Sequence, residues 1–353
     1  MNGGIGDGSM AANSIEISAG GRWVRVPALD FRGRSITVKG GLVKLAAIHD
    51  EWWLESEIEN PEICIKLLKE QKSRKLRADV FTFSQKMPGS AAKYQYASEP
   101  ESVAAARVAN FKEWWEKLPQ ESRKNVRRSQ KRGVEIRTLK FGNQLIEGIA
   151  GVNNDSPMRQ GKANAHYGKS LDQVKKDHES FVDRSEFLCA YFENEMIGYL
   201  KVVYKVDVAA ILNLAVKASH NDKRPANALI STAVEHCAAR RMEYLTYGFF
   251  NYGNKKGSPL REFKTRNGFE EVLTPRYYVP LTNWGSLALK LNFQRGLLGI
   301  LPESLITFSG DARLKWYNFK QFLSRCSSML ERPNRIRQTE RSNPPAGSNS
   351  DSE

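Results

Sequence analysis

Residues 186–250 constrain the fold of this chain more than any other stretch of its sequence. Three apolar, strand-prone runs follow one another between residues 187 and 216, and a polar break at 193–195 separates the first two. An amphipathic segment comes next, with apolar residues at 3.6-residue spacing, and another strand-prone run occupies 244–250. This order predicts a hairpin, a third strand, a helix that ends near Arg240 and a further strand.

The turn at 219–228 joins the third of these runs to the helix. Asn221 or Asp222 is suited to cap the helix, because a short polar side chain can accept a hydrogen bond from the first helical amides. Lys223 and Arg224 lie at the positive end of the helix dipole, which is unfavourable for a cation by roughly 0.3–1 kcal/mol. Cations, exposed N–H groups and small side chains at one helix start favour an anion site for phosphate. The alternative is a solvated loop.

The composition indicates which partners and compartments suit the chain. A formal net charge of +15 over 353 residues favours a polyanionic partner such as tRNA, a nucleotide-activated donor or an acidic membrane surface. The four cysteines are far apart in apolar contexts, which favours reduced core residues and a cytoplasmic protein without zinc. No run of 18 apolar residues and no signal-peptide core is present. We expect a cytoplasmic protein, or one peripheral at the inner membrane face.

Composition shifts predict five regions along the chain. Short strands between residues 23 and 48, a helix from Asn60 and a strand at 79–83 suggest an N-terminal α/β region, and the linker-like 93–101 suggests a boundary. We expect 103–118 to be helical. The predicted regions are a disordered N-terminus (1–20), an N-terminal α/β region (21–100), a main domain (101–282), a C-terminal helical extension (283–330) and a disordered tail (331–353).

A helix expected after Pro119 carries the densest basic cluster of the sequence. Arg123, Arg127 and Lys131 share one i, i+4 row, and three more cations form the adjacent row. Like charges on such rows repel by roughly a few tenths of a kcal/mol per pair. A bound anion near Arg127 and Lys131 would offset this repulsion; the alternative is a solvated helix face.

The polar segment 153–169 is long for a loop within a compact domain, and such loops are commonly functional. His166 could act as a general base, because its unperturbed pKa lies near neutrality. Arg159 could hold a carboxylate or phosphate in a bidentate pair. The alternative is a surface loop packed on a neighbouring helix. The candidate substrate-binding residues here are Arg159, Gln160, Tyr167 and Lys169.

Several catalytic motifs are absent from the whole sequence. It contains no Gly-x-x-x-x-Gly-Lys-Ser/Thr, no Gly-x-Gly-x-x-Gly after a strand, no His-Glu-x-x-His and no Gly-x-Ser-x-Gly. No Cys/His set has zinc-finger spacing. These absences argue against a P-loop hydrolase, a Rossmann dehydrogenase, a zinc protease and a serine esterase. A direct-transfer enzyme that needs no metal remains.

The order of elements over residues 110–282 resembles the GNAT acyltransferase superfamily, and in particular its FemAB-like branch. The segments Ser122–Val134, Phe263–Phe269 and Pro275–Leu281 carry the wider resemblance. It implies an α/β (α+β) fold with a GNAT-like mixed, largely antiparallel sheet flanked by helices, in two GNAT-like halves. In the family, the turn after the fourth strand binds the donor's pyrophosphate. The match places Lys223 at the first position of the loop pattern and Ala226 and Ala228 at its two glycine positions, and Arg224 and Asn227 between them are further candidates for binding the donor.

The resemblance also implies an activity. An acyl or aminoacyl group would pass directly from acyl-CoA (acetyl-CoA) or aminoacyl-tRNA to an amine of a cell-envelope precursor, sugar or metabolite. Amides near Leu214 and Val216 would orient the carbonyl, and Tyr247 or Tyr252 would protonate the leaving thiolate. The candidates for deprotonating the amine are His166, His220 or a water held by Asp155 or Asp222.

Two further expectations concern partners. The chain could instead be a catalytically silent GNAT-fold binding protein for nucleic acid or an acidic membrane surface. Residues 284–301 mix leucines with Lys290 and Arg295, which is typical of a docking helix or a membrane-surface helix. The sequence leaves the oligomeric state open.

Overall fold

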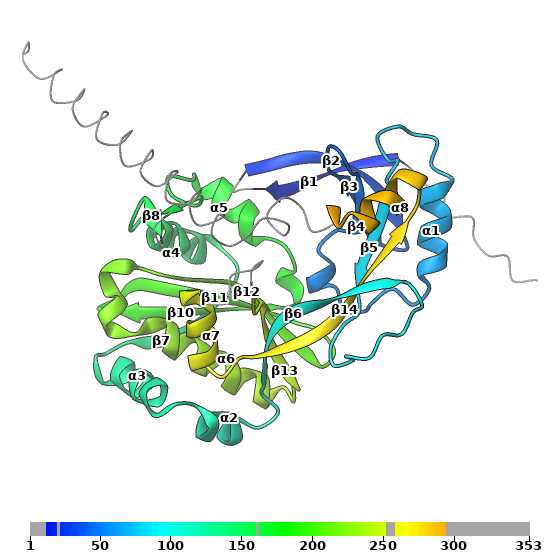
Figure 1. Cartoon of the computed structure of the whole chain (residues 1–353). Coiled ribbons are helices and arrows are strands. Elements are labelled where there is room, and N and C mark those ends of the chain that lie inside the picture. Colours follow the sequence, from blue (N-terminus) through cyan, green and yellow to red (C-terminus); the bar gives the residue numbers. More distant parts are fainter. Residues whose placement is uncertain (1–11, 20–21, 160–161, 252–257, 294–353) are drawn as a thin grey trace, which may run out of the picture. The chain divides into compact units, whose positions relative to one another are not determined.

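The computed structural model describes residues 12–19, 22–159, 162–251 and 258–293 (Figure 1). The chain divides into two units, 1–301 and 302–353, and all described residues belong to the first. Its helices are α1 (Pro61–Lys69), α2 (Phe111–Lys117), α3 (Gln120–Lys131), α4 (Asn143–Asn153), α5 (Leu171–His178), α6 (Pro225–Ala239), α7 (Pro259–Arg266) and α8 (Asn283–Lys290), with 3₁₀ turns η1 (Glu51–Trp53), η2 (Val182–Arg184) and η3 (Ala218–Lys223).

The described strands form one large sheet and a two-stranded hairpin, β8 (Met158–Arg159) with β9 (Lys162–Ala163). Along the large sheet the order is β1-β2-β3-β4-β5-β14-β6-β13-β12-β11-β10-β7. Its strands are β1 (Ala12–Ala19), β2 (Arg22–Phe31), β3 (Arg34–Lys39), β4 (Leu45–Ile48), β5 (Val80–Ser84), β6 (Ala97–Arg107), β7 (Glu135–Leu139), β10 (Ser185–Phe192), β11 (Glu195–Tyr204), β12 (Val208–Val216), β13 (Tyr244–Phe249) and β14 (Glu270–Pro280).

The sheet consists of two halves with the same topology. In the C-terminal half, β10, β11 and β12 are antiparallel, α6 crosses over, and β13 pairs parallel to β12. In the N-terminal half, β2, β3 and β4 are antiparallel, α1 crosses over, and β5 pairs parallel to β4. The two halves join through β14 and β6, which pair antiparallel with each other. This mixed, largely antiparallel sheet in two GNAT-like halves confirms the predicted fold class.

Helices cover both faces of the C-terminal half. Helix α6 packs on one face, where Leu229, Ile230, Ala233 and Cys237 are fully buried, and α3 packs outside it (Figure 1). These four residues recur at helical spacing, so the predicted amphipathic helix is confirmed. Helix α4 covers the other face, with Leu145 and Ile149 fully buried. The N-terminal half has its own apolar core beside α1.

Three local predictions differ from the structure. Residues 12–19, expected to be disordered, form β1 along β2, because Ile15 and Ile17 alternate with polar residues as in a strand with one buried face. The expected linker at 93–101 and helix at 103–118 instead contain β6 and the short helix α2. The small residues of 103–106 are fully buried between β13 and β14, and this pairing outweighs the helical propensity of alanine.

A buried histidine at the end of α5 makes stability depend on pH. Burial lowers the pKa of His178 to about 4, although the Val174 carbonyl 2.9 Å from Nδ1 favours the charged form. The unfolded chain takes up this proton below about pH 6.5, whereas the native chain takes it up only near pH 4. We therefore expect the free energy of unfolding to fall by roughly 3 kcal/mol from this group as the pH falls from 6.5 to 4.

Urea unfolding of the native protein and of His178→Gln at pH 7, 5.5 and 4.5 checks this expectation. The variant should lose less stability on acidification than the native protein, since it has no proton to take up at this site. Parallel pH profiles for the two proteins would contradict the assignment of the pH dependence to His178.

Candidate functional site

The two parallel strands of the C-terminal half separate after three residue pairs. Strands β12 and β13 pair from Val208–Tyr244 to Ala210–Thr246, and no pair joins them beyond that point. Strand β12 stays with β11 up to Val216, while β13 pairs with β6 and shifts register before Phe249. The result is an opening between the carboxyl ends of two central strands.

The open side of β12 presents backbone groups toward this opening. Lys217 N–H donates to the Ile197 carbonyl of β11 at 2.8 Å. Because backbone groups alternate in direction along a strand, those of Leu214 and Val216 point away from β11. Arg159 confirms this direction, since its guanidinium donates to the Leu214 carbonyl from the open side at 3.1 Å. The amides of Leu214 and Val216 are therefore placed to bind a ligand carbonyl.

A pocket of about 860 Å³ occupies the opening. The first turns of three helices meet there: Glu121 and Ser122 come from α3, Arg224 to Asn227 from α6, and Ser258 to Leu260 from α7. A helix start carries about half a positive charge, so three of them favour an anion. The described residues that line it are Glu121, Ser122, Asn125, Arg159, Leu214, Val216, Asn221, Arg224, Pro225, Ala226, Asn227, Tyr247, Ser258, Pro259, Leu260, Phe263, Arg266 and Asn267.

The charged side chains of the pocket add to this positive potential. Arg159, Arg224 and Arg266 line it, and among the described lining residues Glu121 is the one carboxylate. Arg266 also pairs with Glu262 on the exposed side of α7 at 2.5 Å. The guanidinium groups come from three different elements, and each can make bidentate contacts with phosphate oxygens.

The start of α6 differs from the predicted cap. Arg224, rather than Asn221 or Asp222, precedes the helix, and its backbone is left-handed with φ 57°. No side chain caps the helix, because η3 places the preceding polar residues in their own turn. Pro225 has no N–H, and Ala226 N–H has no hydrogen-bond partner among the described residues. A backbone donor at the helix start is thus available to an anion.

Asp155 fixes the turn between β12 and α6. Its carboxylate accepts hydrogen bonds from Ala218 N–H at 2.6 Å and from Ser219 Oγ at 2.6 Å. Burial opposes ionisation, but these bonds and the nearby Lys217 outweigh it and lower the pKa of Asp155. Because both of its carboxylate oxygens accept hydrogen bonds, Asp155 holds residues 218 and 219 in place between β12 and α6.

Tyr247 reaches the pocket from β13, next to a buried lysine. The ammonium of Lys264 lies 4.6 Å from the centre of the Tyr247 ring and donates to the Phe249 carbonyl at 2.6 Å. Burial lowers the pKa of Lys264 to about 8. Lys264 therefore holds the end of β13 where it leaves β12 and places a cation beside the Tyr247 ring.

Several other predicted residues gather away from this pocket. His166 Nδ1 lies 3.5 Å from Asp177 Oδ2, and Lys169 Nζ lies 2.5 Å from the same oxygen. Trp23 of β2 donates to the other carboxylate oxygen at 2.9 Å. Burial works against ionisation of Asp177, yet these partners lower its pKa to about 2. The cluster links the segment before α5 to the N-terminal half, and the nearby Tyr167 is exposed.

The remaining donor-loop residues spread around the start of α6. His220 and Lys223 lie beside the Phe192 ring of the β10–β11 hairpin, outside the pocket lining. Ala228 is a buried residue of α6 and lines a hollow together with residues of α3, away from the first pocket. On α3, Arg127 lies over the Trp115 ring and lines the same hollow, and Lys131 is exposed. Of the remaining predictions, Gln160 and Tyr252 lie outside the described residues.

Helices α3 and α7 and the residues that flank α7 contribute pocket residues that the sequence analysis did not identify. Asn125 of α3, Ser258 before α7 and Asn267 directly after α7 are examples, and Asn267 Oδ1 accepts a hydrogen bond from the Asn227 side chain at 3.0 Å. Ser258 followed by Pro259 is a recognisable helix start, and Ser258 Oγ does accept from Arg261 N–H at 3.2 Å. The sequence signal for this wall was therefore present.

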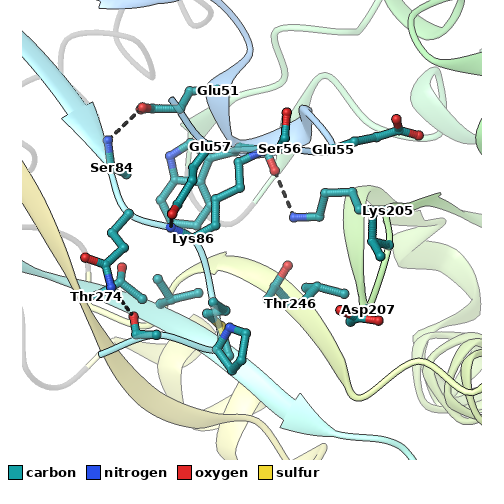
Figure 2. Close-up of a pocket in the computed structure, with 18 of the residues that line it drawn as sticks. Glu51, Glu55, Ser56, Glu57, Ser84, Lys86, Lys205, Asp207, Thr246 and Thr274 are labelled. Carbon is teal, nitrogen blue, oxygen red and sulfur yellow. Dashed lines mark hydrogen bonds between the residues drawn. The ribbon is translucent and has the colours of Figure 1, made fainter. Parts of the chain in front are cut away.

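A second pocket, of about 330 Å³, lies beside Thr246 of β13 (Figure 2). Thr246 lines it while the next residue, Tyr247, lines the first, because successive strand side chains point to opposite faces. Residues 51–57 of the N-terminal half form one wall, and the β11–β12 turn forms another. In Figure 2, Lys205 reaches across to this wall and donates to the Trp52 carbonyl at 3.1 Å.

Two lysines in this second pocket have lowered pKa values. Burial lowers the pKa of Lys86 to about 7, helped by the nearby Lys205 cation, and burial lowers the pKa of Lys205 to about 8. Glu57 accepts from Lys86 N–H at 2.9 Å, and Asp207 lies at the pocket rim. The pocket therefore combines partly neutral amines with carboxylates, a setting suited to an amine ligand.

The described residues contain no group of three His, Cys, Asp or Glu side chains that could hold a metal ion. They also contain no helix of the length and apolar character that crossing a bilayer requires.

Solved structures similar to this chain were found at low sequence identity. No protein-family model and no curated protein matches the sequence. Among solved structures, FemX has a TM-score of 0.48 at 10% identity, covering 80% of this chain and 90% of that chain. L-PGS from Bacillus licheniformis has a TM-score of 0.47 at 14% identity, covering 76% of this chain and 87% of that chain. A tandem GNAT protein from the clavulanic acid biosynthesis pathway has a TM-score of 0.40 at 10% identity, covering 73% of this chain and 83% of that chain.

The strand order of this chain itself agrees with the predicted resemblance to the FemAB-like branch of the GNAT fold. The resemblance concerns the fold, and the duplicated strand order and the separated β12 and β13 are its structural basis. In this GNAT-like fold the first pocket lies at the separated strands and the second pocket lies between the two halves.

Proposed function

We propose that the protein is an N-acyltransferase that moves an acyl group from a phosphate-bearing donor to an amine. The observation that carries this proposal is the meeting of three helix starts and three arginines around the opening between β12 and β13. Donor phosphates would bind Ala226 N–H and the guanidinium groups. The donor's acyl arm would lie along β12, with its carbonyl at the amides of Leu214 and Val216.

We infer that acyl-CoA is the donor. An aminoacyl-tRNA donor would draw on the basic face of α3, yet Arg127 and Lys131 lie outside the first pocket. The compact set of anion-binding groups suits the phosphates of a single nucleotide. The alternative is a catalytically silent GNAT-fold protein that binds nucleic acid or an acidic membrane surface, and the exposed cations of α3 support that alternative.

The acceptor amine would enter from the second pocket, where the exposed carboxylates of Glu55 and Asp207 favour an amine. Its nitrogen attacks the thioester carbonyl carbon, a C–N bond forms and the C–S bond breaks. Lys86, partly neutral near pH 7, takes the proton from the amine. The Tyr247 hydroxyl protonates the leaving thiolate from the first pocket. The opening between the strands lets the reactants meet across the sheet.

Thermal unfolding in the presence of acetyl-CoA, longer acyl-CoAs and charged tRNA tests this proposal. An acyl-CoA at 100 times its dissociation constant should stabilise the protein by about 2.7 kcal/mol. Stabilisation by charged tRNA alone would move the donor assignment to aminoacyl-tRNA. If none of these donors stabilises the protein, and charge reversals along 123–132 abolish binding of nucleic acid or anionic lipid, the binding-protein alternative holds.

A further inference from the structure

Helix α8 exposes apolar side chains on the surface of the N-terminal half. Trp284, Leu287 and Leu291 are 37%, 46% and 49% exposed, and Leu42 in the turn before β4 is 74% exposed. The indole N–H of Trp284 donates to the Leu42 carbonyl at 2.9 Å, so these residues form one surface. We call Leu42, Trp284, Leu287 and Leu291 the apolar patch.

The buried side of α8 is firmly held by the sheet. A Cβ atom added to Gly285 would lie 1.9 Å from the Asp79 carbonyl oxygen, so the helix touches the backbone at the start of β5. Thr282 caps the helix by accepting from Gly285 N–H at 2.9 Å and donates to the Asp79 carboxylate at 3.0 Å. Ala288 is fully buried. These contacts fix the orientation of α8, which leaves Trp284, Leu287 and Leu291 on its exposed side.

A basic segment borders the apolar patch. Lys44, two residues after Leu42, donates through Nζ to the Arg74 carbonyl at 3.3 Å, and Asp79 N–H donates to the Lys44 carbonyl at 2.8 Å. The side chains of four cations between α1 and β5 are exposed, and none forms an ion pair within the described residues. We call these cations, Lys72, Arg74, Lys75 and Arg77, the basic rim.

We propose that the apolar patch and the basic rim together form a binding site for an anionic lipid surface. Tryptophan and leucine side chains insert at the boundary between headgroups and acyl chains, and nearby cations bind lipid phosphates. The patch has the apolar groups that this environment requires, and the rim has the complementary charge. This proposal is independent of the acyl-transfer proposal, since neither pocket contains any of these residues.

Vesicle flotation of the full chain tests the proposal. The protein should bind vesicles that contain phosphatidylglycerol roughly 10-fold or more tightly than pure phosphatidylcholine vesicles, and added salt should weaken this binding. Leu42→Ser/Leu287→Ser/Leu291→Ser and Arg74→Glu/Lys75→Glu should each reduce binding by roughly 10-fold or more. The control is Leu171→Ser/Lys112→Glu, which changes an exposed leucine and an exposed cation elsewhere and should bind like the native protein.

Tryptophan fluorescence shows which part of the protein touches the lipid. Lipids brominated in the upper acyl chain should quench tryptophan fluorescence in the native protein, and Trp284→Phe should remove most of that quenching. Equal binding of the patch and control variants would overturn the proposal. A second outcome would also overturn the proposal: the leucine variant binds vesicles like the native protein, but its residues 294–353 are cut faster by a protease. In that case the apolar patch would be the docking site of the chain's own C-terminal segment.

Discussion

Ala226→Asp should weaken acetyl-CoA binding by more than 100-fold and leave the protein as stable as before, or slightly more stable. The new carboxylate would stand in the first turn of α6, at the amide proposed to bind donor phosphate. Two unit charges about 5 Å apart repel by about 3 kcal/mol at an effective dielectric constant of about 20. The same carboxylate interacts favourably with the helix dipole, by roughly 0.3–1 kcal/mol.

Leu171→Asp is the matched control, since it places a carboxylate in the first turn of α5, outside both pockets. It should keep acetyl-CoA affinity unchanged. Isothermal titration with acetyl-CoA and urea unfolding of both variants provide the two readouts. If Ala226→Asp binds acetyl-CoA as the native protein does, the donor phosphates do not lie at the start of α6. Loss of stability in the variant would instead show that the substitution disturbs the fold.

Arg276→Met should destabilise the protein by about 3–5 kcal/mol at neutral pH. The Arg276 guanidinium lies 2.6 Å from Glu101 and 3.3 Å from Glu51, and all three side chains are largely buried. It joins β14 to β6 and to residues 51–57, which line the second pocket. Methionine fills similar space but leaves two carboxylates in an apolar setting without their cation.

The pH dependence of this loss distinguishes an uncompensated charge from poor packing. Burial already raises the pKa of Glu51, against the opposing effect of Arg276. Without the arginine the pKa of Glu51 would rise further, whereas that of a glutamate in the unfolded chain lies near 4.3. The penalty of Arg276→Met should therefore be full at pH 7 and should shrink as the pH falls toward 4. Arg276→Met/Glu51→Gln/Glu101→Gln should recover much of the stability at pH 7, and a pH-independent loss would indicate packing instead.

The sequence predicts the C-terminal half well, because its strands and α6 carry regular apolar periodicity. Leu229 and Cys237 fall on the buried side of α6 as expected, and β13 begins at Tyr244. The helix start was predicted as an anion site from its cations and small residues. Arg224 and Ala226 do line the first pocket, and whether they bind a donor stays a prediction.

Other features depend on contacts between residues that are distant in the sequence, and local sequence patterns therefore cannot predict them. The alanines of 104–106 favour a helix by propensity, but β13 and β14 flank them and make them a strand. Lys223 was predicted to bind the donor, yet its ammonium lies over the ring of Phe192, which belongs to the β10–β11 hairpin. Similarly, Asn267 reaches the pocket only because α7 packs beside α6.

The position of β14 has a consequence for biosynthesis. Strand β5 lies near the start of the chain, but its neighbour on one side is β14, the last strand of the sheet to leave the ribosome. During translation the N-terminal half therefore carries an unsatisfied edge until almost the whole described chain has emerged. Nascent chains stalled before residue 270 should be prone to aggregation, and a single cut between the halves should release no fragment with a complete sheet.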